Sequence, residues 1–293
     1  MLFRSAIDEI RRAGVLACNF SCNNAHQFEL VRELSPHFDV NLHAEKGATE
    51  KFAAIGAAPL WWPMASNPKY FRPHDLPRTI EASFVGTNYA LRARYVKRLL
   101  DAKIDVHAYG PAWTGGARSP LRSAAKRALL QLRAMTARRG AAQTRASALL
   151  AEHEFRRLLA RSYPAAVHPP ASDDEMIVLH SRSQISLGFV EAFLHNDPSA
   201  PIVRHVHLRE FEGPMCGALY CTGFTEELAE AFEPDREIVM YRDEDELLAK
   251  VRFYLGHPDE AAQVREAARR RALAHHTYHA RFKSLFAQLR IGR

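Results

Sequence analysis

Helix-like and strand-like hydrophobic patterns alternate along most of the sequence, and this alternation restricts the fold more than any single motif does. In the first part of the chain, helices are predicted at 2–13, 25–38 and 48–56, and strands at 15–20, 39–44 and 58–64. Parallel strands need long crossover connections, which are usually helices, so the alternation predicts an α/β fold with a parallel sheet. Three strands make up only part of a doubly wound domain.

A proline-rich stretch at 67–81 interrupts the alternation, and we interpret it as a linker because it has no apolar period. Beyond it, strands are predicted at 81–86, 104–110, 184–189, 216–222 and 237–241, and helices at 89–103, 243–257, 258–276 and 277–290. The sequence therefore predicts two α/β units joined by a hinge. The predicted boundaries are a partial N-terminal domain at 1–72, a linker at 73–80, a C-terminal domain at 81–275 and a closing helix at 276–293.

Basic residues concentrate in a predicted helical insertion at 116–170. The whole chain has a net charge of +7, which indicates anionic partners. Eleven Lys and Arg residues lie between Arg118 and Arg161, against two acids, Glu152 and Glu154. Apolar residues recur in the same segment every three or four positions, at Leu121, Ala125, Leu129, Leu132 and Met135.

A basic amphipathic helix of this kind suits peripheral contact with an anionic membrane, or contact with nucleic acid. The alternative, which we favour, is a solvated insertion that packs one face on its own domain. Aromatic residues are not interleaved with the basic ones, so stacking on bases has no support and no nucleic acid partner is expected.

The four cysteines, Cys18, Cys22, Cys216 and Cys221, have spacings that fit neither a zinc site nor a dense disulfide framework. We therefore expect free, mostly buried thiols and no metal site. No apolar run approaches the roughly 18–20 residues of a transmembrane helix, and the N-terminal segment has no signal-peptide pattern. The predicted location is cytoplasmic, with any membrane contact at the periphery of the bilayer.

Candidate ligand-binding residues lie where predicted strands end. In open α/β sheets, ligands bind beyond the carboxyl ends of strands, where helix N-termini offer unpaired N–H groups. A glycine there lets the backbone approach a phosphate, and an arginine in the first turn can pair with phosphate oxygens. The candidates after the strands at 81–86 and 104–110 are Gly86, Thr87, Asn88, Arg92, Arg94, Tyr109 and Gly110.

A further candidate segment is 205–223, HVHLREFEGPMCGALYCTG, which places charged residues just before an apolar strand. It represents either an exposed helix start before a glycine turn or a polar ligand site at a strand end. Glu210 and Glu212 lie two residues apart at a helix start and do not face each other. The paired carboxylates of a glycoside hydrolase are therefore not expected here.

Six segments, taken in order, resemble the CgeB/YkvP-like glycosyltransferases, which are often described as spore-maturation or group 1 glycosyltransferase-like proteins. The segments are SFVGTN, IDVHAYGPAW, SQISLGF, REFEGPMCGALYCTGFTEEL, EIVMYRDEDELLAKVRFYL and HHTYHARF. The resemblance covers residues from about 80 to 289. Its most specific motif is R-x-F-E-x-P-x-x-G, formed by Arg209, Phe211, Glu212, Pro214 and Gly217. A second signature is formed by His276, Thr277, Tyr278 and Arg281.

The resemblance implies a GT-B architecture, in which two Rossmann-like domains face a cleft and the C-terminal domain holds the nucleotide-sugar donor. It places Glu212 on the ribose hydroxyls, since a carboxylate can accept two neighbouring O–H donors. It makes Arg92 or Arg94 the partner of the diphosphate, where positive charge stabilises the leaving group. Arg209 is a weaker candidate, because it can instead pair with Glu210 or Glu212.

The same resemblance implies a retaining, metal-independent hexosyltransferase, for which the nucleotide sugar is a co-substrate and no cofactor is needed. The expected acceptor is a saccharide or another molecule, with a cell-envelope glycan as one example. The alternative is a non-catalytic nucleotide-sugar-binding protein with a degenerate N-terminal domain.

Two departures from the family pattern affect these expectations. Arg204 stands where group 1 enzymes carry a second glutamate, so a second contact to the donor sugar is not expected. The acceptor-side N-terminal domain is expected to be short or truncated, because no glycine-rich first βα unit is present. No catalytic base can be named, although His26, His37 and His43 are available in that domain.

Overall fold

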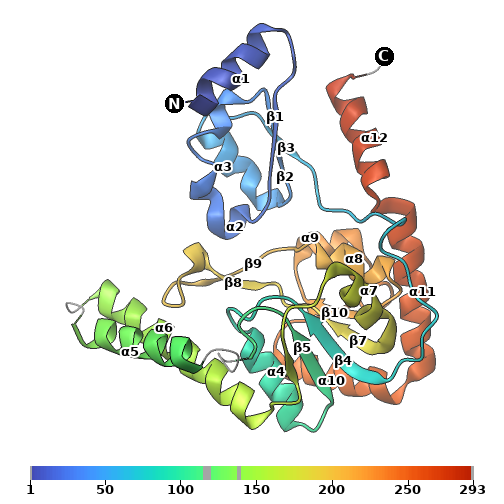
Figure 1. The fold of residues 1–293 in the computed structure, drawn as a ribbon. Helices are drawn as coiled ribbons and strands as arrows, with labels where there is room; N and C mark the ends of the chain where they lie inside the picture. Colours follow the sequence, from blue (N-terminus) through green and yellow to red (C-terminus); the bar gives the residue numbers. More distant parts are fainter. Residues whose placement is uncertain (1, 115–119, 137–139, 292–293) are drawn as a thin grey trace.

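The computed structural model of the chain describes residues 2–114, 120–136 and 140–291 and shows two parallel β-sheets with their helices (Figure 1). The N-terminal sheet has the order β1-β2-β3, with parallel pairing throughout. Its strands are β1 (Cys18–Ser21), β2 (Val40–His43) and β3 (Pro59–Trp61). The accompanying helices are α1 (Leu2–Arg12), α2 (Asn24–Gln27) and α3 (Thr49–Ala54), with 3-10 turns at Phe28–Leu30, Ser35–His37 and Lys46–Ala48.

The C-terminal sheet has six parallel strands in the order β11-β10-β7-β4-β5-β6. The strands are β4 (Ile80–Val85), β5 (Val106–Tyr109), β6 (Val167–His168), β7 (Ser183–Leu187), β10 (Tyr220–Gly223) and β11 (Val239–Tyr241). β5 and β6 add to one side of β4, whereas β7, β10 and β11 add to the other side. The order therefore reverses between β4 and β7, which makes this the topological switch point where doubly wound sheets bind ligands.

Helices connect these strands, and an antiparallel hairpin follows β7. The helices are α4 (Arg92–Asp101), α7 (Asp173–Arg182), α8 (Arg209–Met215), α9 (Glu226–Ala231), α10 (Glu244–Gly256), α11 (Pro258–His275) and α12 (Tyr278–Leu289). The hairpin consists of β8 (Glu191–Phe193) and β9 (Ile202–Arg204), joined through a 3-10 turn at Leu194–Asn196. Two further helices, α5 (Pro120–Thr136) and α6 (Ala141–Ser162), form a helical hairpin between β5 and β6.

The core of the C-terminal domain lies between the six-stranded sheet and the helices that cover it. Val96 and Leu99 of α4, and Leu247 and Val251 of α10, are fully buried in it. Each pair is spaced by three or four residues, so each helix presents one apolar stripe to the sheet.

The two domains are joined twice, by the segment 62–79 and by α12, which returns toward the N-terminal sheet (Figure 1). Trp62 packs with Leu42 and with Leu285 of α12, and its Nε1 donates to the carbonyl oxygen of Arg281 at 3.2 Å. Arg281 in turn donates to the carbonyl oxygens of Pro63 (3.1 Å) and His275 (3.0 Å). Arg281, which belongs to the second sequence signature, thus links the segment between the domains to the end of α11.

The predicted alternation is confirmed, but some elements were predicted wrongly. The helix expected at 25–38 is only the short α2 followed by two 3-10 turns, one of which contains Pro36. The strand expected at 15–20 begins at Cys18, and Val15 and Leu16 are 57% and 44% exposed. β6, α7 and the β8–β9 hairpin were not predicted. β6 has only two residues, and each strand of the hairpin has only three, which is too short to show a period in the sequence.

The predicted insertion is helical; α5 packs on α6, and the end of α6 packs on the domain. Leu130 and Ala146 are each 7% exposed, and Leu159 is fully buried. Arg118, Arg138, Arg139 and the side chain of Leu121 lie outside the described residues. Within the described ranges, no helix has both the length and the apolar character to cross a bilayer.

The expectation of mostly buried thiols was half wrong. All four cysteines are free, but Cys18 and Cys22 are exposed, whereas Cys216 and Cys221 are buried.

Candidate active site

Arg92 lies at the switch point, where the loops after β4 and β7 diverge. Its guanidinium donates to the Thr87 carbonyl oxygen (2.9 Å), the Tyr89 hydroxyl (2.8 Å) and the Phe189 carbonyl oxygen (3.1 Å). Thr87 follows β4 and Phe189 follows β7, so one side chain joins both loops. Arg92 is 6% exposed, and burial lowers the pKa of its guanidinium.

The positive charge of Arg92 is not neutralised by a carboxylate within ion-pair distance among the described residues. Besides the two carbonyl oxygens, the guanidinium contacts the ring of Tyr89, whose centroid lies 3.8 Å from the guanidinium carbon. Its Nε is buried and has no hydrogen-bond partner in this part of the chain. A buried guanidinium without a counter-ion is suited to bind an anion such as phosphate.

Glu210, near the start of α8, holds in place the loop that carries His207, the histidine beside Arg92. It is fully buried, and its two oxygens accept hydrogen bonds from His207 N (2.8 Å) and Thr222 Oγ1 (3.0 Å). Burial raises the pKa of this carboxyl to about 7. These bonds fix the loop before α8 to the end of β10, with His207 Nε2 3.2 Å from Nη2 of Arg92.

Glu212 points elsewhere, as expected for a residue two positions further along a helix start. It forms an ion pair with Arg209, whose guanidinium also lies 4.0 Å from Asp173 at the start of α7. Glu212 is 3% exposed and burial raises the pKa of its carboxyl, whereas the Arg209 side chain is 34% exposed. Of the two structural partners considered for Arg209, the structure selects Glu212.

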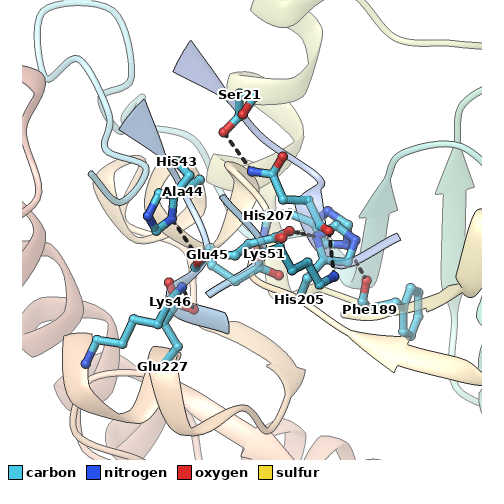
Figure 2. Close-up of polar contacts among 12 residues, drawn as sticks. Ser21, His43, Ala44, Glu45, Lys46, Lys51, Phe189, His205, His207 and Glu227 are labelled. Carbon is cyan, nitrogen blue, oxygen red and sulfur yellow. Dashed lines mark hydrogen bonds and ion pairs between the residues drawn. The ribbon is translucent and has the colours of Figure 1, made fainter. Parts of the chain in front are cut away.

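The two domains meet through a group of buried polar side chains beside this site (Figure 2). Glu45, in the loop after β2, has Oε1 3.2 Å from Nδ1 of His205 in the loop before α8. The His205 ring lies 4.7 Å from the ring of His26 and 4.0 Å from that of His207. Desolvation lowers the pKa of His26 to about 4 and lowers that of His207 well below its usual range. Of the two neutral imidazoles, His207 lies next to Arg92, whereas His26 reaches this group through the ring of His205.

The other two histidines considered as bases lie in different surroundings. His43 stacks on Phe52, and its Nδ1 lies 3.0 Å from the carbonyl oxygen of Glu45. His37 belongs to the 3-10 turn at Ser35–His37, and its backbone carbonyl faces Arg11. Of the three, His26 is the one in contact with the histidines at the domain boundary.

Gly110 is explained by the close approach of its backbone to that of Gly86. Gly110 has φ +145°, and a Cβ on it would lie 2.1 Å from the Gly86 carbonyl oxygen. Trp113, which is fully buried, donates to the same oxygen at 2.7 Å. Asn88 is buried too and donates through its backbone N–H to the carbonyl oxygen of Pro111 at 2.9 Å. These residues shape the loops around Arg92, and whether they touch a ligand stays a prediction.

The remaining predicted residues are dispersed. Arg94 is exposed on α4, and no hydrogen bond or ion pair of its side chain is found among the described residues. Tyr109 stacks on His168 of β6, with ring centroids 4.3 Å apart. Gly217 has φ +70° after the end of α8, and its carbonyl oxygen accepts from Arg78 at 2.9 Å. The structure therefore does not bring Arg94 or Tyr109 to Arg92.

A cavity of about 260 Å³ opens between the domains on the other side of α8. Its lining includes Trp61, Phe211, Glu227 and Arg281, so β3, α8, α9 and α12 all contribute. Trp61 is 37% exposed, and its Nε1 lies 3.3 Å from Glu227 Oε1. An aromatic face beside a carboxylate suits a polyhydroxylated ligand, because the carboxylate accepts O–H donors and the ring packs against C–H groups.

Four residues of this site were not predicted from the sequence as members of one site: Glu45, His205, His207 and Glu210. His205 and His207 flank an apolar residue just before the charged run, and that spacing was the available signal. No sequence signal pointed to Glu45, because its position at the domain boundary depends on tertiary structure. Within the described ranges, no group of three His, Cys, Asp or Glu side chains is arranged to hold a metal ion.

Solved structures with a similar fold are glycosyltransferases. Sucrose-phosphate synthase from Thermosynechococcus elongatus aligns with a TM-score of 0.56 and 13% identity over 90% of this chain, and the chain covers 62% of it. A glycosyltransferase from Rickettsia africae aligns with a TM-score of 0.58 and 10% identity, over 97% of this chain and 78% of its own. HepE from Anabaena, solved with UDP and glucose, aligns with a TM-score of 0.64 and 9% identity, over 98% and 75% of the two chains.

The chain thus spans less than two thirds of the synthase and about three quarters of the other two proteins. At these identities the likeness establishes the fold, which is the two-domain GT-B fold. No curated protein matches the sequence. The family model described as "Glycosyl transferase-like" matches residues 92–287, which is more than half of the chain and runs from Arg92 through α8 into α12. The chain therefore belongs to the glycosyl transferase-like family.

Proposed function

We propose that this protein transfers a sugar from a nucleotide-sugar donor to a saccharide acceptor bound in the cleft between its domains. The observation that carries the proposal is the buried guanidinium of Arg92, which lies at the switch point of the C-terminal sheet and has no carboxylate within ion-pair distance in the described part of the chain. Family membership gives the reaction class, and HepE, a protein of the same fold, was solved with UDP-glucose.

The donor diphosphate is proposed to pair with Arg92. As the sugar leaves, negative charge develops on the diphosphate, and a fixed cation in a dry site stabilises that charge strongly. Tyr89 and His207 cover the guanidinium in this structure, so binding requires one of these side chains to move. Because Arg92 supplies the positive charge, we propose a metal-independent reaction. Retention of configuration is proposed on the family resemblance.

Glu212 is proposed to accept the ribose hydroxyls. Its present partner, Arg209, is 34% exposed, whereas Glu212 itself is buried. A buried carboxylate must stay hydrogen-bonded, and two ribose hydroxyls can replace the guanidinium as its donors.

The acceptor is proposed to bind the 260 Å³ cavity beside α8, with Trp61 against the sugar ring and Glu227 on its hydroxyls. Burial raises the pKa of Glu227, and the carboxylate already receives the backbone N–H of Lys46 at 3.1 Å, which holds it in place. A cell-envelope glycan is the acceptor that the resemblance favours.

A second candidate function is nucleotide-sugar binding without turnover. It is favoured by the short N-terminal sheet, which has three strands among the described residues. Incubation of the purified chain with radiolabelled UDP-, GDP- and ADP-sugars separates the two functions. Release of free sugar, or its transfer to added glycosides, supports the transferase. Tight donor binding with no release over many hours supports the binding protein and contradicts the transferase.

A further inference from the structure

The outward side of α5 carries a row of exposed apolar side chains. Leu129, Leu132 and Met135 are 47%, 57% and 83% exposed, and they recur every three residues, so they lie along one side of the helix. Leu130, by contrast, is 7% exposed, and the element on which α5 packs is α6. The helix is therefore apolar on two sides, and only one of them is used in packing.

Basic residues border this exposed row. Lys126 and Arg133 are both exposed, and at 100° per residue they project next to Leu129, on the side away from Met135. α5 contains no acidic residue. The two acids of α6 are paired: Glu152 with Arg156 at 3.1 Å, and Glu154 with Arg127 and Arg157. The hairpin is thus strongly cationic, and the positive charge beside the apolar row is not cancelled within it.

The position of the hairpin keeps this side open. α5 and α6 project from the C-terminal domain, at the opposite end of the molecule from α11 and α12 (Figure 1). An ion pair between Arg145 of α6 and Asp197 of the β8–β9 hairpin, at 3.1 Å, fixes its orientation. The row on α5 is therefore presented at a defined angle to the rest of the enzyme.

We propose that the outward side of α5, defined by Leu129, Leu132, Met135, Lys126 and Arg133, binds the surface of an anionic membrane. An amphipathic helix with an apolar row and basic borders lies in the interface plane, with its apolar side chains among the acyl chains and its cations on the headgroups. Positive charge complements anionic lipids and contributes about fivefold in affinity per cation, equivalent to about 1 kcal/mol. This surface is separate from the donor site and goes beyond the proposed transferase activity.

Other binding partners fit the outward side of α5 less well. A single-stranded nucleic acid uses aromatic side chains as stacking platforms, and α5 has none. A second copy of this chain would bring one cationic hairpin against another, unless it docked through a different surface. Anionic lipid satisfies both the charge and the apolar row at once.

The test is co-sedimentation of the full chain with unilamellar vesicles, either of phosphatidylcholine alone or with phosphatidylglycerol added. Binding to the anionic vesicles only, which weakens as salt is raised, is the expected result. A chain that remains in the supernatant with anionic vesicles at low salt overturns the proposal.

Two sets of variants assign the binding to α5. Leu129→Ser/Leu132→Ser/Met135→Ser should reduce binding at least tenfold, and Lys126→Glu/Arg133→Glu should reduce it more at low salt than at high salt. Leu273→Ser and Arg252→Glu, at exposed positions of α11 and α10, are matched controls and should bind as the unmodified chain does. Because all of these side chains are exposed, circular dichroism should show unchanged folding.

Three outcomes contradict the assignment. The first is undiminished vesicle binding by the α5 variants. The second is a dimer, seen by light scattering, that the triple apolar variant abolishes, which would make a second copy the occupant. The third is tighter binding to an RNA homopolymer than to anionic vesicles. Nucleotide binding measured on the same variants should not change, so this test is independent of the proposed transferase function.

Discussion

His205 and Glu45 meet across the boundary between the two domains, with Nδ1 of the histidine 3.2 Å from Oε1 of the carboxylate. Their side chains are 1% and 6% exposed, so neither one can exchange this partner for water. Glu45 follows β2 and His205 precedes α8, the helix that carries Glu210 and Glu212. The contact therefore links the N-terminal domain to the proposed donor site.

We predict that Glu45→Ala opens the cleft. Leaving His205 buried without this carboxylate costs about 1–3 kcal/mol, which the chain can relieve by separating the domains. Small-angle scattering should show a larger radius of gyration, and chemical denaturation a lower free energy of unfolding. His37→Ala, in the 3-10 turn remote from the boundary, is the control. An unchanged radius of gyration would show that the contact does not hold the domains together.

The second prediction concerns pH. The pKa of Glu210 is raised from 4.5 to about 7 in the folded chain, so between these values the folded state holds a proton that the unfolded state has released. The stability that this carboxyl contributes is therefore fully present below pH 4.5 and is lost as the pH rises to about 7, by up to about 3 kcal/mol.

The histidines act in the opposite direction. The pKa of His26 is lowered to about 4, so stability from this residue is gained as the pH rises from about 4 toward 6.5. For this reason the free energy of unfolding is compared, at each pH, between Glu210→Gln and the unmodified chain. Glu210→Gln, which removes only the carboxyl titration, should become progressively more stable relative to the unmodified chain as the pH rises from 5 to about 8. Parallel stability curves for the two proteins across that range would contradict the assignment.

The third prediction is that Gly110→Ala is strongly destabilising. A Cβ there would lie 2.1 Å from the carbonyl oxygen of Gly86, and that backbone has no room to move because Trp113 donates to the same oxygen. Gly14→Ala is the matched control, since Gly14 also has a positive φ (+73°) but no atom within 4 Å of the added Cβ. The control should cost about 1–2 kcal/mol and Gly110→Ala clearly more. Equal melting temperatures for the two variants would refute the packing argument.

The fourth prediction separates the two substrates. Trp61→Ala should reduce transfer to added glycosides at least tenfold while leaving slow hydrolysis of the donor unchanged, because Trp61 lines the proposed acceptor cavity and not the donor site. Phe253→Ala, at a similarly exposed aromatic residue on α10, should change neither rate. A parallel loss of hydrolysis and transfer in Trp61→Ala would place this residue in donor binding.

Much of the fold was predictable, because it depends on local patterns. The helices α4, α10, α11 and α12 and the strands β4, β5, β7 and β11 each carry an apolar period that identifies them. The short elements were not predictable: β6 has two residues, and the α2 region breaks into turns that are held by contacts such as Phe28 on Phe52, 5.1 Å between ring centroids.

The candidate site was predicted in part, for a related reason. Arg92 and Glu212 follow from strand ends and from the family motif, so both were identified in the sequence. Arg94 has the same residue type and lies in the same helix, but it points to solvent, and the sequence alone does not tell the two arginines apart. Glu45 and His205 are 160 positions apart in the sequence, and only the meeting of the two domains brings them together.

The central claim, that Arg92 receives the donor diphosphate, is tested most directly by calorimetric titration of UDP, GDP, ADP and CDP into the unmodified chain, Arg92→Gln and Arg94→Gln. The two variants remove the same charge from the first turn of α4, one at the switch point and one in solvent. We predict that Arg92→Gln weakens binding of the preferred nucleotide about 10–100-fold, the effect of losing a charged hydrogen bond, and that Arg94→Gln binds as the unmodified chain does. Equal affinity of Arg92→Gln and the unmodified chain would contradict the account.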